Sequence, residues 1–475
     1  MKGSTLRKII AIVMGVYVLA VVAFYFLAGH QLRFRNSRGN IAMPEQVIQY
    51  AELTDGVTVE QSFFAPIQRF ESVSVKFATG VRDTNEGTVL MEWLRADTGE
   101  TLARETFDAA AIAEGEVLSL SLGEAREDLY NVPMLLRVSA DSEEGKCVSV
   151  ILAAKRGGDE TVLNLRPDDA TLFFSASGED YIWSGMHYWY FAAGGALLLA
   201  LYFLAVYLRN ARGKTGFFVK TVSAMQKYRF LIRQLVARDF KTKYKRSVLG
   251  VLWSFLNPLL MMVVQYFVFS TIFKSDIRFY PAYLLIGIVS FNFFSEACGM
   301  CLTSVTGNAA LITKVYVPKY IYPLTRLMSS TINLGISLIP LIIVSLFTGV
   351  RFTQAAILSL YFWVCLIVFS LGLGMLLSAS MVFFRDTQFL WNVLSMIWMY
   401  GTPIFYPDSI IPERFRIILR VNPLFHFIKN ARVCILEGIS PEPKAYVVCF
   451  LFAAGMLLVG SFIFRKTQDR FLLYV

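Results

Sequence analysis

Phe352 to Phe384 reads FTQAAILSLYFWVCLIVFSLGLGMLLSASMVFF, which is 33 residues without a charged side chain. An α-helix rises about 1.5 Å per residue, so about 20 apolar residues cross the ~30 Å hydrocarbon core of a bilayer. The stretch therefore predicts a membrane-spanning helix, and with it a membrane protein rather than a soluble enzyme.

Further apolar runs lie on both sides of this one. The whole chain has 475 residues, of which 56% are hydrophobic and 17% charged, whereas soluble domains average about 25% charged residues. The first run has too long an apolar core for a signal peptide, so we expect an uncleaved anchor. We predict eight spans: Ile9–Ala28, Tyr188–Leu208, Val248–Phe273, Phe279–Thr313, Leu327–Val350, Phe352–Phe384, Thr387–Pro407 and Ala445–Phe464.

The charges are divided unevenly along the chain. Residues 37–181 hold 26 Asp/Glu and 12 Lys/Arg, whereas residues 209–246 carry 12 Lys/Arg and a single acid, Asp239. Because Lys and Arg are enriched in cytoplasmic loops, we expect both termini inside and residues 30–185 outside. Membrane orientation explains the basic excess, so we expect no nucleic-acid partner. The alternation of spans places 408–444 outside, although this segment holds six Lys/Arg against four acids.

The acidic block alternates apolar and polar residues, the pattern of strands with one buried face. We therefore predict an antiparallel β-sandwich or jelly-roll domain inserted between the first two spans. A spacer or assembly role and a glycan-binding role both stay open for it, with Trp93 and Trp183 either stacking on a sugar or packing as core or interface residues. The alternation runs through Val73, Val75 and Phe77, Leu118, Leu120 and Leu122, Met134, Leu136 and Val138, and Val148, Val150 and Leu152.

Sequence motifs for catalysis and metal binding are weak. Gly213-Lys-Thr215 lacks the preceding glycine of a phosphate-binding loop, since residue 208 is Leu. Cys298 and Cys301 lie in an apolar run, where small residues pack helices together. His30, His187 and His426 have no metal-ligand spacing. We expect no catalytic residue, no metal and no cofactor bound by this chain.

Glu296 is the only acid within an otherwise continuous apolar run. A charge within a membrane is costly and faces a cavity or a partner. Two interpretations remain, of which the second is favoured: a pathway or gating residue, or a residue near the cytoplasmic end that pairs with a lysine such as Lys314.

The order of motifs in residues 226–475 resembles the membrane subunits of ABC-2 type exporters, most closely the permeases for O-antigen, capsule and teichoic acid. That order is a basic amphipathic segment, Gln226–Ser247, then Asn257-Pro258 in a span, the loop Asn308–Pro318, Phe384-Arg-Asp386, Thr402–Pro407 and Asn422-Pro423. The extra anchor and the β-domain depart from the usual pattern of this family.

The resemblance assigns two segments to docking of an ATPase subunit. Asn308 to Pro318 matches the coupling loop, in which Leu311, Ile312 and Val315 would supply apolar knobs and Lys314 could pair with acids of the partner. Gln226 to Ser247 matches the interface helix beside it, with an apolar face of Tyr228, Leu231, Leu235 and Phe240.

The resemblance also implies an exit gate built from re-entrant segments. Its residues would be Pro403, Phe405, Tyr406, Asn422 and Pro423, where proline ends helices. Aromatic faces bind sugars without one fixed hydrogen-bond register, so aromatic residues of the spans are candidates for the translocation path. They are Trp253, Tyr266, Phe291, Phe294, Trp391, Trp398 and Tyr400.

These expectations describe the permease subunit of an ATP-driven exporter for a cell-surface polysaccharide or lipid-linked glycan in a bacterial plasma membrane. Two copies would pair with two ATPase subunits, which hold ATP and Mg. Alternatives are an exporter of a lipid, drug or peptide, and a membrane glycosyltransferase or a sensor. The expected domains are an anchor (1–29), the β-domain (30–185), a second span (186–208), a basic linker with the interface helix (209–247) and the permease domain (248–475).

Overall fold

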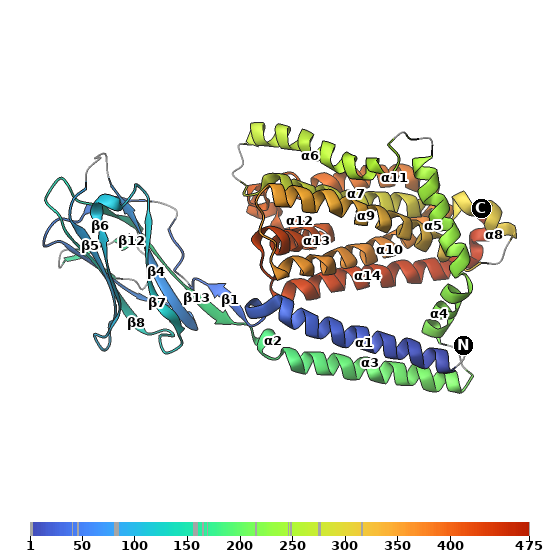
Figure 1. Cartoon of the computed structure of the whole chain (residues 1–475), viewed down its shortest axis with the longest axis horizontal. Coiled ribbons are helices and arrows are strands. Elements are labelled where there is room, and N and C mark those ends of the chain that lie inside the picture. The colour runs from blue at the N-terminus through green and yellow to red at the C-terminus, as the bar shows by residue number, and fades with distance from the viewer. Residues whose placement is uncertain are drawn as a thin grey trace. The chain divides into compact units, whose positions relative to one another are not determined.

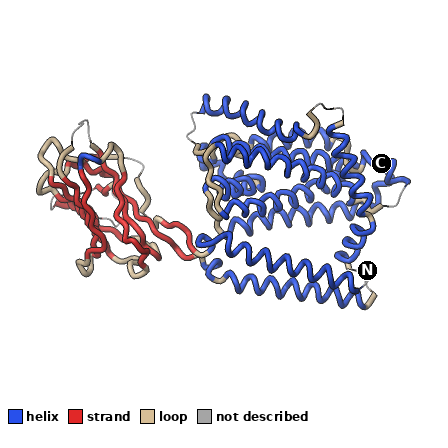
Figure 2. Tube along the Cα trace, viewed as in Figure 1, coloured by secondary structure: helices blue, strands red, loops and turns tan. Residues whose placement is uncertain are grey.

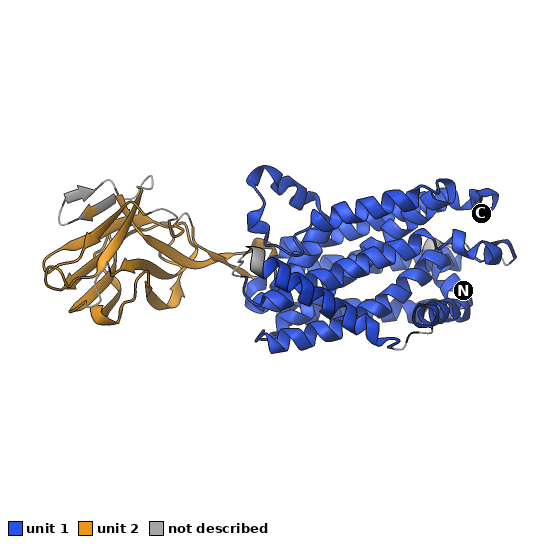
Figure 3. Cartoon of the chain, turned by 90° about the horizontal axis from the view of Figure 1, so that it is seen from above, with its two compact units in different colours: residues 1–32, 187–475 blue, residues 33–186 orange. Residues whose placement is uncertain are grey.

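The computed structural model describes the chain except for residues 1–2, 40, 45–46, 80–84, 155–159, 164–165, 169, 214–215, 246, 248, 274–276, 315–316 and 475. It contains two compact units (Figure 3). One unit is helical and consists of Met1–Leu32 and His187–Val475. The other, Arg33–Met186, is built of strands and is inserted between the first two long helices.

The strand unit contains two antiparallel sheets in its described residues (Figure 2). Its strands are β1 (Phe34–Ser37), β2 (Gln49–Glu52), β3 (Thr58–Phe64), β4 (Arg69–Ala78), β5 (Thr88–Arg95), β6 (Thr101–Asp108), β7 (Val117–Arg126), β8 (Pro133–Asp141), β9 (Ser149–Ala154), β10 (Glu160–Leu163), β11 (Arg166–Asp168), β12 (Ala170–Leu172) and β13 (Phe174–Tyr181). One sheet has the order β1-β13-β4-β9-β12, and in it β2 also pairs with β9 and β7 also pairs with β4. The other has the order β11-β10-β3-β8-β5-β6.

The core of the strand unit lies between its two sheets. Phe63 of β3 meets Phe174 of β13 with ring centroids 5.1 Å apart, and Trp93 of β5 meets Phe70 of β4 at 5.0 Å. Trp93 is fully buried and donates its indole N–H to Met134 Sδ at 3.2 Å. The predicted sandwich is thus present, and Trp93 belongs to its core rather than to a sugar-binding face. Trp183 is 68% exposed.

The helical unit is a bundle of long helices with short helices at its two ends (Figure 1). The long helices are α1 (Gly3–Ala28), α3 (Tyr188–Ala211), α6 (Leu252–Phe273), α7 (Tyr280–Leu302), α9 (Ile321–Phe347), α10 (Ser359–Phe383) and α14 (Pro443–Thr467). The shorter helices are α4 (Phe217–Lys227), α5 (Arg229–Tyr244), α8 (Ala309–Lys314), α11 (Thr387–Tyr400), α12 (Arg416–Val421), α13 (Pro423–Arg432) and α15 (Phe471–Tyr474), and α2 (Trp183–Met186) belongs to the other unit.

Seven helices of the described residues are long and apolar enough to span a membrane. They correspond to seven of the eight predicted spans. The eighth prediction, Thr387–Pro407, is corrected in the length of its helix: α11 has 14 residues and ends at Tyr400, a length of about 21 Å at ~1.5 Å per residue, and non-helical residues complete the segment. Gly401 and Pro403 follow, and a proline cannot donate the hydrogen bond that would continue the helix.

The bundle has two ends, which we name by the short helices that lie there. At the α5 end, α1, α6 and α9 begin and α3, α7, α10 and α14 finish. At the α13 end, α1, α6 and α9 finish and the other four begin (Figure 1). Segment 408–444, which carries α12 and α13, lies at the α13 end. Two of its basic residues have partners or are buried: Lys429 pairs with Asp408 at 2.9 Å, and Arg432 is buried.

Small residues allow the central helices to approach closely. A Cβ atom at Gly460 of α14 would collide with the backbone oxygen of Gly372 in α10. A Cβ at Gly374 of α10 would meet Cys301 Sγ of α7 at 2.8 Å. Cys298 and Cys301 are buried free thiols between these helices, as their apolar run predicted.

Candidate functional site

The α5 end of the bundle has an apolar layer that holds three short segments together. Leu235 of α5, Ile312 of α8 and Phe471 of α15 belong to one buried cluster. The layer also contains Val305, Tyr322, Met375, Ala379, Val382 and Phe464, from the ends of the spanning helices. Helix α5 lies across the end of the bundle, roughly perpendicular to the long helices (Figure 1), so the interface-helix segment and the coupling-loop segment meet here.

The predicted coupling loop forms the turn Thr306–Asn308 and helix α8. Asn308 is buried; its Nδ2 donates to Ser304 O at 2.7 Å, and its Oδ1 accepts from Arg238 Nη2 at 3.2 Å. Pro318 is half-buried, and Val315 lies outside the described residues. Arg238 belongs to α5, so one side chain links the predicted interface helix directly to the predicted loop.

The prediction that Ile312 is a docking knob is corrected. Ile312 is only 8% exposed and packs inside this chain, and Leu311 is half-buried against the same cluster. Because α8 is amphipathic, its apolar side is already used to attach the helix to the bundle. The side that stays exposed carries Ala310, Thr313 and Lys314.

The four residues predicted to form the apolar face of the interface helix divide between two surfaces. Tyr228, Leu231 and Leu235 pack on the buried clusters beneath α5. Phe240 is half-buried and lies on a different side, where it lines a groove toward α9. A change of five residues turns a helix by about 140° at 3.6 residues per turn, so Leu235 and Phe240 do not share a face.

Two ion pairs connect α5 to the spanning helices. Lys243 Nζ lies 2.8 Å from Glu296 Oε1, which also accepts from Asn333 Nδ2 at 2.7 Å. Arg326 Nη1 lies 3.0 Å from Oδ1 of buried Asp239. The favoured interpretation of Glu296 as a lysine partner is thus confirmed, but the lysine is Lys243 rather than Lys314.

These charges line a cleft of about 580 Å³ beside α5. Its described lining residues are Arg238, Asp239, Thr242, Lys243, Glu296, Met300, Gly307 and Arg326. Asp239 lies between Arg238 of α5 and Arg326 of α9, and Glu296 of α7 pairs with Lys243 of α5. Separating α5 from the bundle would therefore break Arg326–Asp239 and Lys243–Glu296. The sequence signal for Asp239 was its position as the single acid among the 12 basic residues of 209–246, but its partner Arg326 has no signal in the sequence.

Asn422 is the centre of the predicted gate at the α13 end. Its Oδ1 accepts from Trp398 Nε1 at 2.8 Å and from Leu424 N at 3.1 Å, where it caps α13. Its Nδ2 donates to Thr402 Oγ1 at 2.8 Å. One amide thereby joins the end of α11, the turn after it and the start of α13. Asn422, Pro423 and the turn Thr402–Pro407, all predicted to belong to the gate, therefore lie together.

The rest of the predicted gate is a buried turn. Pro403 and Phe405 are buried, and Tyr406 is half-buried. Tyr280 Oη donates to Phe405 O at 2.7 Å, and Tyr283 Oη donates to Tyr406 O at 2.9 Å. The turn is therefore held against the first turn of α7.

Arg432 is a buried residue of the gate that the sequence did not reveal. Its guanidinium donates to the oxygens of Pro403 at 2.7 Å, Ile404 at 2.8 Å and Tyr283 at 3.3 Å, and its Cζ lies 3.4 Å from the centre of the Tyr283 ring. The fork of N–H donors suits several carbonyls at once. Gly287 makes room, because a Cβ there would lie 2.8 Å from Arg432 Nη2. Arg432 thus replaces the hydrogen bonds that a non-helical turn lacks.

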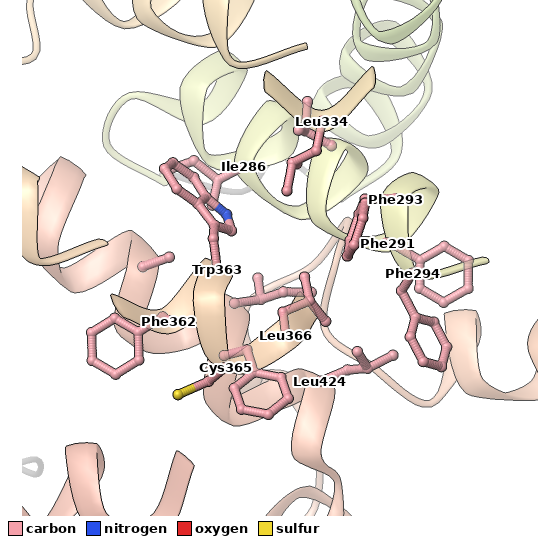
Figure 4. Close-up of a cluster of buried hydrophobic side chains, with 14 of the residues drawn as sticks. Ile286, Phe291, Phe293, Phe294, Leu334, Phe362, Trp363, Cys365, Leu366 and Leu424 are labelled. Carbon is pink, nitrogen blue, oxygen red and sulfur yellow. The ribbon is translucent and has the colours of Figure 1, made fainter. Parts of the chain in front are cut away.

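Four of the seven path candidates belong to the packed interior of this chain. Phe291, Phe294 and Trp391 are buried, and Trp398 is half-buried (Figure 4 shows Phe291 and Phe294). The Phe294 ring lies 5.8 Å from that of Trp391 and 5.2 Å from that of Trp398. The prediction that Phe291, Phe294 and Trp391 line a path is corrected, because side chains that fill a core have no surface for a substrate. Trp253, Tyr266 and Tyr400 are exposed on the helical unit.

The described residues contain no group of three or more His, Cys, Asp and Glu placed to hold a metal. The arrangement is suited to transmitting movement between the short segments and the spanning helices. A short helix at one end is tied by Arg238 and an apolar layer to the spanning helices, and a buried turn at the other end is tied by Asn422 and Arg432.

Residues 231–436 match the family model of the ABC-2 type transporter. The chain is 31% identical over 250 residues to the O-antigen export system permease protein RfbA of Klebsiella pneumoniae, covering 51% of this chain and 93% of that protein. It is 27% identical over 255 residues to RfbA of Myxococcus xanthus, covering 53% and 98%. It is 24% identical over 265 residues to the polysialic acid transport protein KpsM of Escherichia coli, covering 54% and 98%.

These matches cover nearly the whole of each relative and about half of this chain. Arg238 and Asn308 at the α5 end, and Asn422 and Arg432 at the α13 end, all lie within the residues of the family model. Together with the spanning helices, this makes the protein a multi-pass membrane protein, and the chain belongs to the family of ABC-2 type transporter permeases.

Proposed function

We propose that this chain is the permease subunit of an ATP-driven exporter that moves a cell-surface polysaccharide or lipid-linked glycan across a bacterial inner membrane. The relatives include an O-antigen export system permease protein and a polysialic acid transport protein. Within the described residues we find no metal cluster, and the sequence has no phosphate-binding loop. The proposal therefore places ATP and Mg on a partner subunit.

The observation that carries the proposal is the attachment of α8. This six-residue helix is fixed to the bundle by Ile312 on one side and presents Thr313 and Lys314 on the other. A short rigid helix with a buried root and an exposed tip suits transmission of a push from a docked ATPase. Arg238 and the two ion pairs of α5 would carry that push to α7 and α9.

The proposed assembly contains two permeases and two ATPases. In this assembly a path for the glycan forms between the permeases, so its lining comes from exposed surfaces rather than from the core of one chain. Trp253, Tyr266 and Tyr400 remain candidates, since they are 45%, 38% and 61% exposed. In the same proposal the α5 end and both termini are cytoplasmic, and the strand unit lies outside.

The strand unit is proposed to receive the emerging glycan or to dock a partner in the envelope. The burial of Trp93 removes one of its two candidate sugar-stacking residues. Two-layer antiparallel sandwiches serve many functions, so the ligand is decided by experiment. Glycan-array binding to the full chain, compared with a chain in which 37–181 is replaced by a short linker, separates glycan recognition from a spacer role.

The test of function uses the purified permease with its ATPase partner in proteoliposomes. We expect a lipid-linked glycan to stimulate ATP hydrolysis. We also expect ATP to change the fraction of glycan that an external glycosidase can cleave, in a direction set by the orientation of the permease in the vesicle. Stimulation by small hydrophobic drugs, with none by glycan-lipid, contradicts the proposed cargo. ATP hydrolysis by this chain alone contradicts the proposed division between permease and ATPase.

A further inference from the structure

A groove between α5 and α9 has a lining that differs from the charged cleft on the other side of α5. Its volume is about 600 Å³. Its described lining residues are Met225 of α4, Arg229, Ile232, Arg233, Val236, Ala237 and Phe240 of α5, and Met328 and Ile332 of α9. The lining is apolar apart from the two arginines, and none of these residues is acidic.

Arg229 and Arg233 lie one helical turn apart on the same side of α5, and both are exposed. The described ion pairs of α5 involve Arg238, Asp239 and Lys243, which face the cleft instead. The two guanidinium groups thus form a positive end of the groove with no carboxylate in its described lining. Two adjacent guanidinium groups bind the oxygens of a phosphate well, because their N–H donors form a fork.

An exposed apolar stripe continues from the groove along α9. It consists of Met328, Ile332, Ile339, Ile342, Ile343 and Leu346, which are 38–60% exposed. These positions recur at helical spacing, so they lie on one side of α9. At Gly335, between Ile332 and Ile339, a Cβ atom would meet nothing within 4 Å. No other part of the described chain covers the stripe at this position.

The level of the groove along the bundle decides what can reach it. Helix α9 is long and apolar enough to span a membrane, and its residues 328–332 lie in its first half, counted from the α5 end. Helix α5 lies across that end (Figure 1), and its five Lys/Arg suit the level of the lipid headgroups. A cation pair at headgroup depth, followed by an apolar stripe that runs into the membrane, matches the two parts of a phospholipid.

We propose that this groove binds an anionic phospholipid of the leaflet at the α5 end, with its phosphate between Arg229 and Arg233 and an acyl chain along the α9 stripe. Basic pockets beside spanning helices on the cytoplasmic side are suited to anionic headgroups. The site is separate from the translocated cargo and depends only on the membrane insertion of the helical unit. Lipid bound here fills the space between α5 and α9 and thereby holds α5 in place.

The test titrates the purified full-length chain in a non-ionic detergent with phosphatidylglycerol or phosphatidylcholine and counts bound lipids by native mass spectrometry. We expect phosphatidylglycerol to bind more tightly. Replacing Arg229→Gln and Arg233→Gln should weaken it by roughly fivefold for each arginine and about 25-fold for both. The matched control, Lys241→Gln with Lys245→Gln, removes one charge from the last turn of α5 and one from the residue that follows it. Neither lysine lines the groove, and the control should change the affinity less than twofold.

Two further variants keep the proposal testable if the glutamine pair does not fold. Arg229→Lys with Arg233→Lys keeps both charges and should retain most of the binding, while Ile332→Ser should weaken it through the acyl part alone. Equal affinity for the two lipids, or equal losses in the test and control pairs, overturns the proposal. Displacement of the lipid by millimolar inorganic phosphate would show that the acyl chain contributes nothing to binding, and would overturn that part of the proposal. Loss of self-association in the arginine variant would also overturn the proposal, because the groove would then be a contact between two copies of the chain.

Discussion

Trp398 Nε1 donates to Asn422 Oδ1 at 2.8 Å, and this bond ties the last turn of α11 to the first residue before α13. The segment that follows α11, residues 401–407, is largely buried but not helical. Buried backbone groups need partners, and side chains supply many of them here. Asn422, Arg432, Tyr280 and Tyr283 all reach this turn or its ends.

Removing the Asn422 amide should loosen the gate. We expect Asn422→Ala to cost about 1–3 kcal/mol, because it leaves Trp398 Nε1 and Leu424 N without the oxygen that accepts from them. Hydrogen exchange measured by mass spectrometry should become faster in 401–424. Trp363→Phe is the control, since Trp363 makes a similar indole bond of 3.2 Å to Ser290 outside the gate; faster exchange of 401–424 in that variant would contradict a local role.

Arg432 should not tolerate lysine. A single ammonium group cannot replace the fork that reaches Pro403, Ile404 and Tyr283. We expect Arg432→Lys to lower stability by about 3 kcal/mol and to reduce the melting temperature in fluorescence-detected size exclusion. Exposed Arg420→Lys, on the neighbouring α12, should melt like the unaltered chain, and equal melting of the two variants would show that the carbonyl contacts contribute nothing.

The pair Lys243–Glu296 should behave as a coupled unit. Both side chains are partly exposed, at 40% and 31%, so the pair is expected to contribute only about 1 kcal/mol. In a double-mutant cycle, Lys243→Met and Glu296→Gln should each destabilise the chain, and the double variant should cost less than their sum. Additive losses would mean that Asn333, rather than Lys243, satisfies Glu296.

The docking role and the folding role of α8 can be tested separately, because its exposed side and its buried side carry different residues. Thr313→Asp with Lys314→Glu alters only exposed positions, so we expect a folded permease that no longer co-purifies with its ATPase. Ile312→Asp places a charge in the buried layer and should destabilise the chain itself by more than about 3 kcal/mol. Normal co-purification of the exposed-side variant would remove α8 from the docking surface.

The contact between α10 and α14 should depend on Gly460. A Cβ atom there collides with Gly372 O, so Gly460→Val should force the helices apart and lower the yield of folded protein. Gly455 on α14 has nothing within 4 Å of its Cβ position, and Gly455→Val should be tolerated. Similar yields for the two variants would contradict close packing of these helices.

The predicted spans and strands agree with the structure because each rests on a local property. An uncharged run such as Phe352–Phe384 satisfies its own backbone only as a helix within a bilayer, and period-2 alternation around Val73 buries one face of a strand. The span at Thr387–Pro407 is where local hydropathy misleads. Its apolar residues after Tyr400 form a turn, not a helix, because Pro403 stops the helix and Arg432 satisfies the turn.

The predicted site residues also divide into those that the sequence placed correctly and those that it misplaced. Asn308, Asn422 and the prolines were recognisable from motif order, and the structure joins Asn308 to α5 and Asn422 to α11. The resemblance together with apolar character made Ile312 a docking residue, and aromatic character made Phe294 a path residue, whereas both pack inside the chain. An apolar side chain attracts any apolar neighbour, so its sequence cannot tell a partner protein or a substrate from the chain's own core.

The sequence by itself determined that this protein crosses a membrane many times, carries an inserted sandwich and belongs with export permeases, since hydropathy, alternation and motif order are written along the chain. Only the tertiary structure decided which charges meet. Lys243 with Glu296, Arg326 with Asp239 and Arg432 with three carbonyls are separated by 53, 87 and up to 149 positions. Coulombic and hydrogen-bond partners are chosen by distance in space, and that distance is fixed by how the helices pack.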